Sequence, residues 1–106
     1  MTRFWLVFSL AFLGAIGCAA EIGDDCNTNL DCGTAKQCDL SQPGGYCTAA
    51  NCDSVPCPDG AICVAFSEQD HFCMAACDSN SDCRDSYVCV KNFGPHPFCN
   101  SVAAPE

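Results

Sequence analysis

The amino-acid sequence predicts a small disulfide-rich fold of three tandem four-cysteine modules, with little helix apart from an N-terminal signal peptide. Cysteine accounts for 13 of the 106 residues, a density typical of disulfide scaffolds. Twelve of the cysteines fall into three sets of four, and each position in a set recurs 25 or 26 residues later. Repetition at a fixed period is the signature of a tandem array. Each module is expected to contain a turn-rich segment followed by a short β-hairpin.

The three modules are expected to span residues 26–47, 52–73 and 77–99, with a flexible tail at 100–106. The sequence between the cysteines repeats as well. The first and third modules both open with Cys, Asp or Asn, Ser or Thr, Asn, a variable residue, Asp and Cys, and an aromatic residue precedes the last cysteine of every module. The twelve cysteines are Cys26, Cys32, Cys38 and Cys47; Cys52, Cys57, Cys63 and Cys73; and Cys77, Cys83, Cys89 and Cys99.

The second half of each module has the composition of a hairpin. Short β-prone runs at 61–66 and 87–90 are followed by polar turns that contain Ser, Asn, Gly or Pro, and these are hairpin signals. The first halves are rich in Asp, Asn and Ser, which favour turns or one helical turn capped by an Asx side chain. Because about 25 residues bury too little apolar surface to offset chain entropy, we expect two disulfides per module, each contributing about 3 kcal/mol. Spacing alone leaves three pairings open for four cysteines.

The layout of the four cysteines resembles the first four cysteines of EGF-like modules and the N-terminal cysteine-rich repeat of Dickkopf proteins. The EGF-like resemblance implies that the first cysteine pairs with the third and the second with the fourth. It carries over no activity, because a shared scaffold does not imply a shared function. The implied pairs are Cys26–Cys38, Cys32–Cys47, Cys52–Cys63, Cys57–Cys73, Cys77–Cys89 and Cys83–Cys99.

Residues 1–17 have the pattern of an export signal. Arg3 precedes thirteen mostly apolar residues at 4–16, a run shorter than the roughly 20 residues that a membrane-spanning helix needs but typical of a secretory signal. The segment Ala15-Ile16-Gly17-Cys18 resembles the lipobox of bacterial lipoproteins, which implies lipid attachment to Cys18. Together with the tandem modules, it resembles cysteine-rich lipoproteins of uncharacterised function from Gram-negative bacteria.

The resemblance to lipoproteins also implies a location. Ala19, rather than Asp, follows Cys18, and this implies sorting to the cell outer membrane. Residues 18–25 would then be the lipidated N-terminus and a short tether, whose eight steps from Cys18 to Cys26 reach no more than about 28 Å. The alternative is cleavage after Ala20, which would release a freely secreted effector such as a ligand or a peptidase inhibitor. Both routes leave twelve cysteines to pair.

Charge and spacing exclude several classes of function. The chain carries 13 acidic and 4 basic residues, too few cations to neutralise phosphates, so nucleic-acid binding is excluded. No C-x2-C pair suggests a zinc site. The run from Asp78 echoes an EF-hand loop, but its sixth and twelfth residues are Cys83 and Cys89 instead of Gly and Glu. We expect no metal and no other cofactor, with a looser calcium turn left open beside a plain Asx turn.

The remaining candidates are two histidines and three aromatic residues. His71 and His96 occupy equivalent positions near the last cysteine of their modules, and neither lies in a Ser/His/Asp or H-E-x-x-H setting. No catalytic residue is therefore expected. Phe66, Phe93 and Tyr87 are expected either to be exposed anchors for a partner or to pack on the disulfides of their own module. The sequence predicts a non-enzymatic, lipid-anchored binding or structural protein, whose partners are the membrane and an unknown protein or envelope ligand.

Overall fold

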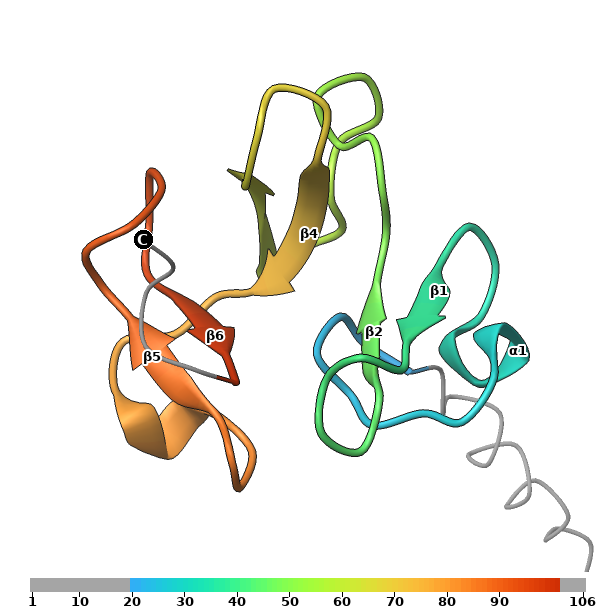
Figure 1. The fold of residues 1–106 in the computed structure, drawn as a ribbon, viewed down its shortest axis with the longest axis horizontal. Helices are drawn as coiled ribbons and strands as arrows, with labels where there is room; N and C mark the ends of the chain where they lie inside the picture. Colours follow the sequence, from blue (N-terminus) through green and yellow to red (C-terminus); the bar gives the residue numbers. More distant parts are fainter. Residues whose placement is uncertain (1–19, 102–106) are drawn as a thin grey trace, which may run out of the picture.

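The computed structural model describes residues 20–101, which form three two-stranded antiparallel hairpins in chain order (Figure 1). This confirms the predicted fold class, a small disulfide-rich protein with little helix. The predicted signal peptide at 1–17, the lipidation residue Cys18 and positions 102–106 of the predicted tail lie outside the described residues. The elements are α1 (Asn29–Cys32), β1 (Gln37–Asp39), β2 (Tyr46–Thr48), β3 (Ala61–Ala65), β4 (His71–Ala75), the 3₁₀ helix η2 (Asn80–Asp82), β5 (Val88–Val90) and β6 (Phe98–Asn100).

Two disulfides in each module fasten the turn-rich half to the hairpin. The hairpin register sets the third and fourth cysteines opposite each other, as in the pair Cys38 and Cys47. Each of these two is bonded to a cysteine of the turn-rich half, so that the first pairs with the third and the second with the fourth. The bonds are Cys26–Cys38, Cys32–Cys47, Cys52–Cys63, Cys57–Cys73, Cys77–Cys89 and Cys83–Cys99.

The repeated polar motif of the first module forms a cap. One carboxylate oxygen of Asp31 accepts hydrogen bonds from the backbone N–H groups of Asn27 and Thr28, at 2.8 and 3.0 Å. The Asn29 side-chain oxygen accepts from the backbone N–H of Cys38 at 2.8 Å and so joins the turn to β1. These bonds hold the pKa of Asp31 below its usual value, because they favour the ionised carboxylate.

The third module repeats this cap with the equivalent residues. Asp82 accepts from the backbone N–H groups of Asp78 and Ser79, at 2.8 and 3.1 Å, and its pKa is lowered for the same reason. The side-chain oxygen of Asn80 accepts from the backbone N–H of Cys89 at 2.8 Å. The motif that echoes an EF-hand loop therefore has a structural use as an Asx turn with a capping aspartate.

The segment that precedes each module pairs with the last strand of that module. Ala50 and Ala76 form isolated β-bridges with Phe72 and Phe98. In the first module, the backbone N–H of Gly23 donates to Cys47 O at 2.8 Å, and the N–H of Cys47 donates to Asp24 O at 2.9 Å.

This pairing corrects one expectation. Residues 21–25 were expected to belong to the tether between Cys18 and the first module. Ile22 is instead buried in the core, at 7% exposure, and the two residues after it are held to β2 by backbone hydrogen bonds. The segment therefore belongs to the folded body.

One apolar core runs through all three modules, in contrast to the separate units that the repeat suggests. Its largest buried side chains are Tyr46 in the first module, Val64 in the second and Phe98 in the third, with exposures of 2, 0 and 0%. Strands β2 and β6 both contact β4, and Figure 1 shows the hairpins β1–β2 and β5–β6 on either side of β3–β4. The buried members of the core are Ile22, Tyr46, Cys52, Val64, Cys73, Met74, Tyr87, Val90 and Phe98.

Arg84 fastens the third module to the first. Its guanidinium donates hydrogen bonds to three backbone carbonyl oxygens of the first module: Gly23 O at 2.7 Å, Gly45 O at 2.9 Å and Pro43 O at 2.7 Å. It also lies over the ring of Tyr87, 4.5 Å from the centroid, and the Tyr87 hydroxyl donates to Pro43 O at 2.8 Å. A planar guanidinium with several donors suits such a multiple contact better than a lysine ammonium would.

Three aromatic residues also join the modules. We expected Phe66, Phe93 and Tyr87 either to be exposed anchors or to pack on the disulfides of their own module, and they do neither. Phe66 of the second module stacks on Phe93 of the third, with ring centroids 5.8 Å apart. Tyr87 of the third module is 5% exposed and lies 5.5 Å from the ring of Tyr46 in the first. They are neither free anchors nor confined to their own module, because a shared core buries more apolar area than three small ones.

Candidate functional site

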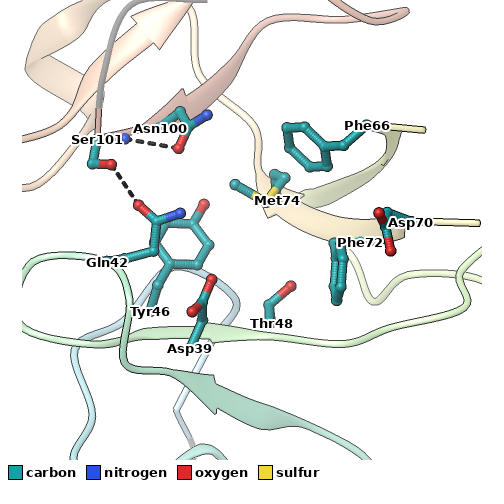
Figure 2. Close-up of a pocket in the computed structure, with 10 residues that line it drawn as sticks. All are labelled: Asp39, Gln42, Tyr46, Thr48, Phe66, Asp70, Phe72, Met74, Asn100 and Ser101. Atoms are coloured by element: carbon teal, nitrogen blue, oxygen red, sulfur yellow. Dashed lines mark hydrogen bonds between the residues drawn. The ribbon is translucent and has the colours of Figure 1, made fainter. Parts of the chain in front are cut away.

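A cleft of about 370 Å³ lies where the three hairpins meet, and it is the candidate functional site. Figure 2 shows its apolar floor, formed by Phe66, Phe72 and Met74, on the opposite side from the polar residues Gln42, Asn100 and Ser101. All three modules contribute to its wall, so no module forms it alone. The lining residues are Asp39, Gln42, Tyr46, Thr48, Phe66, Asp70, Phe72, Met74, Asn100 and Ser101.

The repeat itself places much of this lining. Side chains alternate between the two faces of a strand, so the residues before and after the last cysteine of a module point to the same face. In β2 these residues are Tyr46 and Thr48, and in β4 they are Phe72 and Met74. In β6 the residue after the cysteine, Asn100, lines the cleft as well. The aromatic residue before each last cysteine signalled this face in the sequence, but nothing there indicated that the three faces meet.

Phe66 closes the aromatic side of the cleft. Its backbone N–H donates to Asp70 O at 2.8 Å, which holds the β3–β4 loop in a tight turn. The ring lies 6.4 Å from that of Phe72 and 5.9 Å from that of Phe98, centroid to centroid. With Phe93 stacked behind it, Phe66 is held by packing and presents a fixed apolar surface to the cleft.

Two carboxylates line the cleft at separate places, Asp39 near Tyr46 and Asp70 near Phe72 (Figure 2), and a serine hydroxyl donates to one oxygen of each. Asp39 Oδ1 accepts from both the backbone N–H and the hydroxyl of Ser41, at 3.0 and 2.6 Å. Asp70 Oδ2 accepts from the hydroxyl of Ser67 at 2.9 Å. The lining contains no Lys, Arg or His, so within residues 20–101 no cation of the cleft offsets these two charges.

Three further polar groups of the lining bond to the protein. The Tyr46 hydroxyl donates to Cys99 O at 3.0 Å and accepts from the backbone N–H of Ala75 at 2.9 Å, and burial raises the pKa of Tyr46 to about 12. The Thr48 hydroxyl donates to Cys73 O at 2.7 Å. The Ser101 hydroxyl donates to the side-chain oxygen of Gln42, which bridges the third and first modules across one end of the cleft (Figure 2). These hydrogen bonds join the modules around the cleft.

Asn100 was expected to begin a flexible tail, but it ends β6 and is 5% exposed. Its side-chain oxygen accepts from the backbone N–H of Ser101 at 2.8 Å. Only an oxygen can accept that bond, so the contact fixes the orientation of the amide. Within residues 20–101 the side-chain nitrogen of Asn100 has no hydrogen-bond partner. A buried amide donor without an acceptor is unusual in native proteins.

The other residues singled out in the sequence lie outside the cleft. His71 has its Nδ1 atom 3.9 Å from Asp53 Oδ1, and His96 is exposed; neither lines the cleft. Three cysteine sulfurs lie within 4.8 Å of one another in every module, but all of them are in disulfides. A cysteine binds a metal as its thiolate, and a disulfide sulfur is not one, so these sulfur groups do not fit a metal as they stand.

Comparison with known proteins found no match to this chain among protein-family models, curated proteins or solved structures. The lipoprotein and EGF-like resemblances therefore stay predictions. Within residues 20–101, no helix has the length and apolar character needed to cross a membrane. Six disulfides indicate an oxidising, extracellular or exported environment.

Proposed function

We propose that this protein is a lipid-anchored, non-enzymatic binding protein of the bacterial outer membrane, and that its ligand occupies the cleft between the three hairpins. The single observation that carries the proposal is the cleft itself, in which an apolar floor held by packing lies beside polar atoms of Asp39, Asp70 and Asn100 that have no hydrogen-bond partner within residues 20–101. Such a combination is the usual character of a binding site. The lining contains no histidine, lysine or free thiol that could serve as a nucleophile or its base, which favours binding over catalysis.

The anchor proposed at Cys18 would hold the body close to the membrane. The described part of the chain is packed from Ala20 onward, because Ala20 is partly buried against Cys26, Cys32 and Cys47. Only Ala19 then separates it from Cys18, and two steps of chain reach no more than about 7 Å. This replaces the longer reach of about 28 Å that the sequence suggested for residues 18–25.

One contact favours the alternative of a freely secreted effector. Cleavage after Ala20 would make Glu21 the N-terminus, and its backbone nitrogen lies 2.8 Å from a carboxylate oxygen of Asp24. A new ammonium group at that place would gain an ion pair with the aspartate. Such cleavage would remove Ala20, which packs against Cys26, Cys32 and Cys47, but it would keep Ile22, the first residue of the larger core.

Detergent partitioning and the mass of the mature N-terminus distinguish the two routes. For a lipoprotein, the native chain enters the detergent phase, and the Cys18→Ala variant stays in the aqueous phase because it lacks the acyl chains. An acylated Cys18 in the native chain agrees with this result. An unmodified Glu21 at the N-terminus, or a native chain that stays in the aqueous phase, would establish the secreted alternative.

Photocrosslinking in intact cells tests the binding role. A benzophenone amino acid replaces Phe72, which lines the cleft, and in a matched control it replaces Leu30, which is 90% exposed on α1 outside the cleft. We expect a discrete adduct from position 72 and none from position 30. The same pattern of adducts from both positions, or none from either, would contradict the role of the cleft.

A further inference from the structure

The apolar side of the cleft is suited to a methylene chain or an aromatic ring. Phe66 and Phe72 form one side, with centroids 6.4 Å apart, and Met74 lies between them and Tyr46 in Figure 2. Aromatic faces attract cations as well as apolar groups. The thioether of methionine adapts its shape to a ligand.

The charge around the cleft favours a cation. Asp39 and Asp70 each use one carboxylate oxygen to accept from a serine, and within residues 20–101 the second oxygen of each has no hydrogen-bond partner. The whole chain has a net charge of −9, and Arg84 is already occupied by three carbonyl oxygens of the first module. A field of one sign raises the local concentration of ligands of the opposite sign.

Asn100 adds a requirement that a simple amine does not meet. Asn100 is 5% exposed and lines the cleft. Its side-chain nitrogen donates to no described residue, while its oxygen accepts from the backbone N–H of Ser101. Leaving a buried donor unpaired costs free energy, which a ligand can recover by supplying an acceptor. The ligand should therefore carry a carbonyl oxygen in addition to a positive charge and an apolar stem.

We propose that the cleft binds a lysine or arginine residue within a basic segment of a partner protein, an inference that rests on the proposed binding role. The methylene stem of that side chain lies along Phe66, Phe72 and Met74. Its cationic end pairs with Asp39 or Asp70, and the other carboxylate adds to the negative field. A peptide carbonyl of the segment accepts from the Asn100 side chain. The cleft is at the small end of the range of about 300 to 1,000 Å³ for ligand sites, which suits one or two residues.

The probes for this proposal are three small molecules titrated onto the mature chain. The peptide acetyl-Gly-Phe-Lys-Gly-amide carries all three features, and its norleucine analogue keeps the stem but loses the charge. Spermidine has charges and methylene stems but no carbonyl. We expect the lysine peptide to bind at least about tenfold more tightly than either of the others. Only the peptides should shift the NMR signals of the Asn100 side-chain NH₂ group.

Two variants with the same change in net charge separate the cleft from the general field. Asp39→Asn with Asp70→Asn should weaken binding of the lysine peptide about tenfold. Asp59→Asn with Asp85→Asn changes exposed carboxylates outside the cleft and should change affinity less than about twofold, because salt screens distant charges. All four substitutions are on partly or fully exposed residues, so folding should persist, and six disulfides in the intact mass check it.

The outcomes also separate this inference from the proposed function. Equal binding of the lysine and norleucine peptides would overturn the cationic ligand, and binding of spermidine as tight as that of the lysine peptide would overturn the peptide. Equal losses in the two variant pairs would show general attraction instead of a site. If any of these three results accompanies a discrete crosslinked adduct from position 72, the binding role stands and only the proposed ligand class is wrong. If that adduct is also missing, both proposals fail.

Discussion

The middle module differs from its two neighbours in how it is held, although all three share four cysteines and a hairpin. The first and third modules have a capping aspartate and an asparagine that bonds to the third cysteine. The second module is one residue shorter at this place, and its turn forms by backbone bonds from Ser54 and Val55 to Asn51 O. Its strands are longer, at five residues each, and Val64 is fully buried.

The aromatic residue before the last cysteine differs in burial between the middle module and its neighbours. Tyr46 in the first module and Phe98 in the third are 2 and 0% exposed, but Phe72 in the second is only partly buried. All three have the same place in the repeat. The neighbours decide how far the ring is covered: Tyr46 and Phe98 are buried in the shared core, whereas Phe72 packs against that core and keeps part of its surface exposed in the cleft. Equivalent positions of the repeat are therefore not equally buried.

The largest difference in stability is expected from alanine substitutions at two of these aromatic positions. Phe98→Ala should lower the free energy of unfolding by about 3 to 5 kcal/mol, because it empties a fully buried site in contact with the rings of Phe66 and Phe93. Phe72→Ala should cost only about 1 kcal/mol, because its ring keeps part of its surface in the cleft. Chemical denaturation with the disulfides intact measures both. Equal losses would show that the modules use this position alike.

A second test uses the turn three residues after the second cysteine. Ala35, Gly60 and Ser86 occupy this position in the three modules, with positive φ angles of 63, 87 and 77°. Only the middle module has the glycine that this conformation favours. Ala35→Gly and Ser86→Gly should each raise stability by about 1 kcal/mol, and Gly60→Ala should lower it by a similar amount. A Cβ at Gly60 meets nothing within 4 Å, so strain alone is measured by the shift of the denaturation midpoint.

The smallest expected effect is the loss of stability of the two aspartate caps at low pH. Backbone hydrogen bonds lower the pKa of Asp31 and Asp82, so their stabilisation is complete above the pKa of the unfolded chain. It is lost as the pH falls through the lower pKa of the folded state. NMR signals of the Thr28 and Ser79 amide protons should therefore titrate with midpoints below about 3.9, the ordinary aspartate value.

The middle module provides the control for this pH titration. The Ser54 amide donates to a backbone carbonyl, Asn51 O, and no carboxylate accepts from it, so its signal should show no such transition. A midpoint at the ordinary aspartate value for Thr28 and Ser79, or the same titration at Ser54, would remove this difference between the modules.

Local features of the fold could be predicted from the sequence because neighbouring residues decide them. The cysteine period and the turn residues predicted three hairpins with little helix, which the structure confirms. The repeated Asp and Asn residues predicted Asx turns, and Asp31 and Asp82 bond to backbone groups only three or four residues away. Such contacts need no knowledge of the remaining chain.

The cleft and the joints between modules could not be predicted, because their partners are far apart in the chain. The carbonyls that Arg84 contacts are 39 to 61 residues distant, and the Tyr46 hydroxyl meets the backbone 29 and 53 residues away. Nothing in the sequence near Ile22 separates a buried residue from a tether. Phe66 and Phe93 could be singled out in the sequence as large apolar residues at hairpin ends, but the sequence did not indicate that they pack against each other.

What the sequence by itself determined is the unit of construction: four cysteines, a polar turn and a hairpin, repeated three times. Each unit is specified by spacing, turn chemistry and the alternation of side chains along a strand, all of which act within about 25 residues. The tertiary structure alone decided how the units meet. No unit of this size buries enough apolar surface by itself, so Tyr46, Val64 and Phe98 share one core. That same packing brings Asp39, Asp70 and Asn100 from three separate modules to the wall of one cleft.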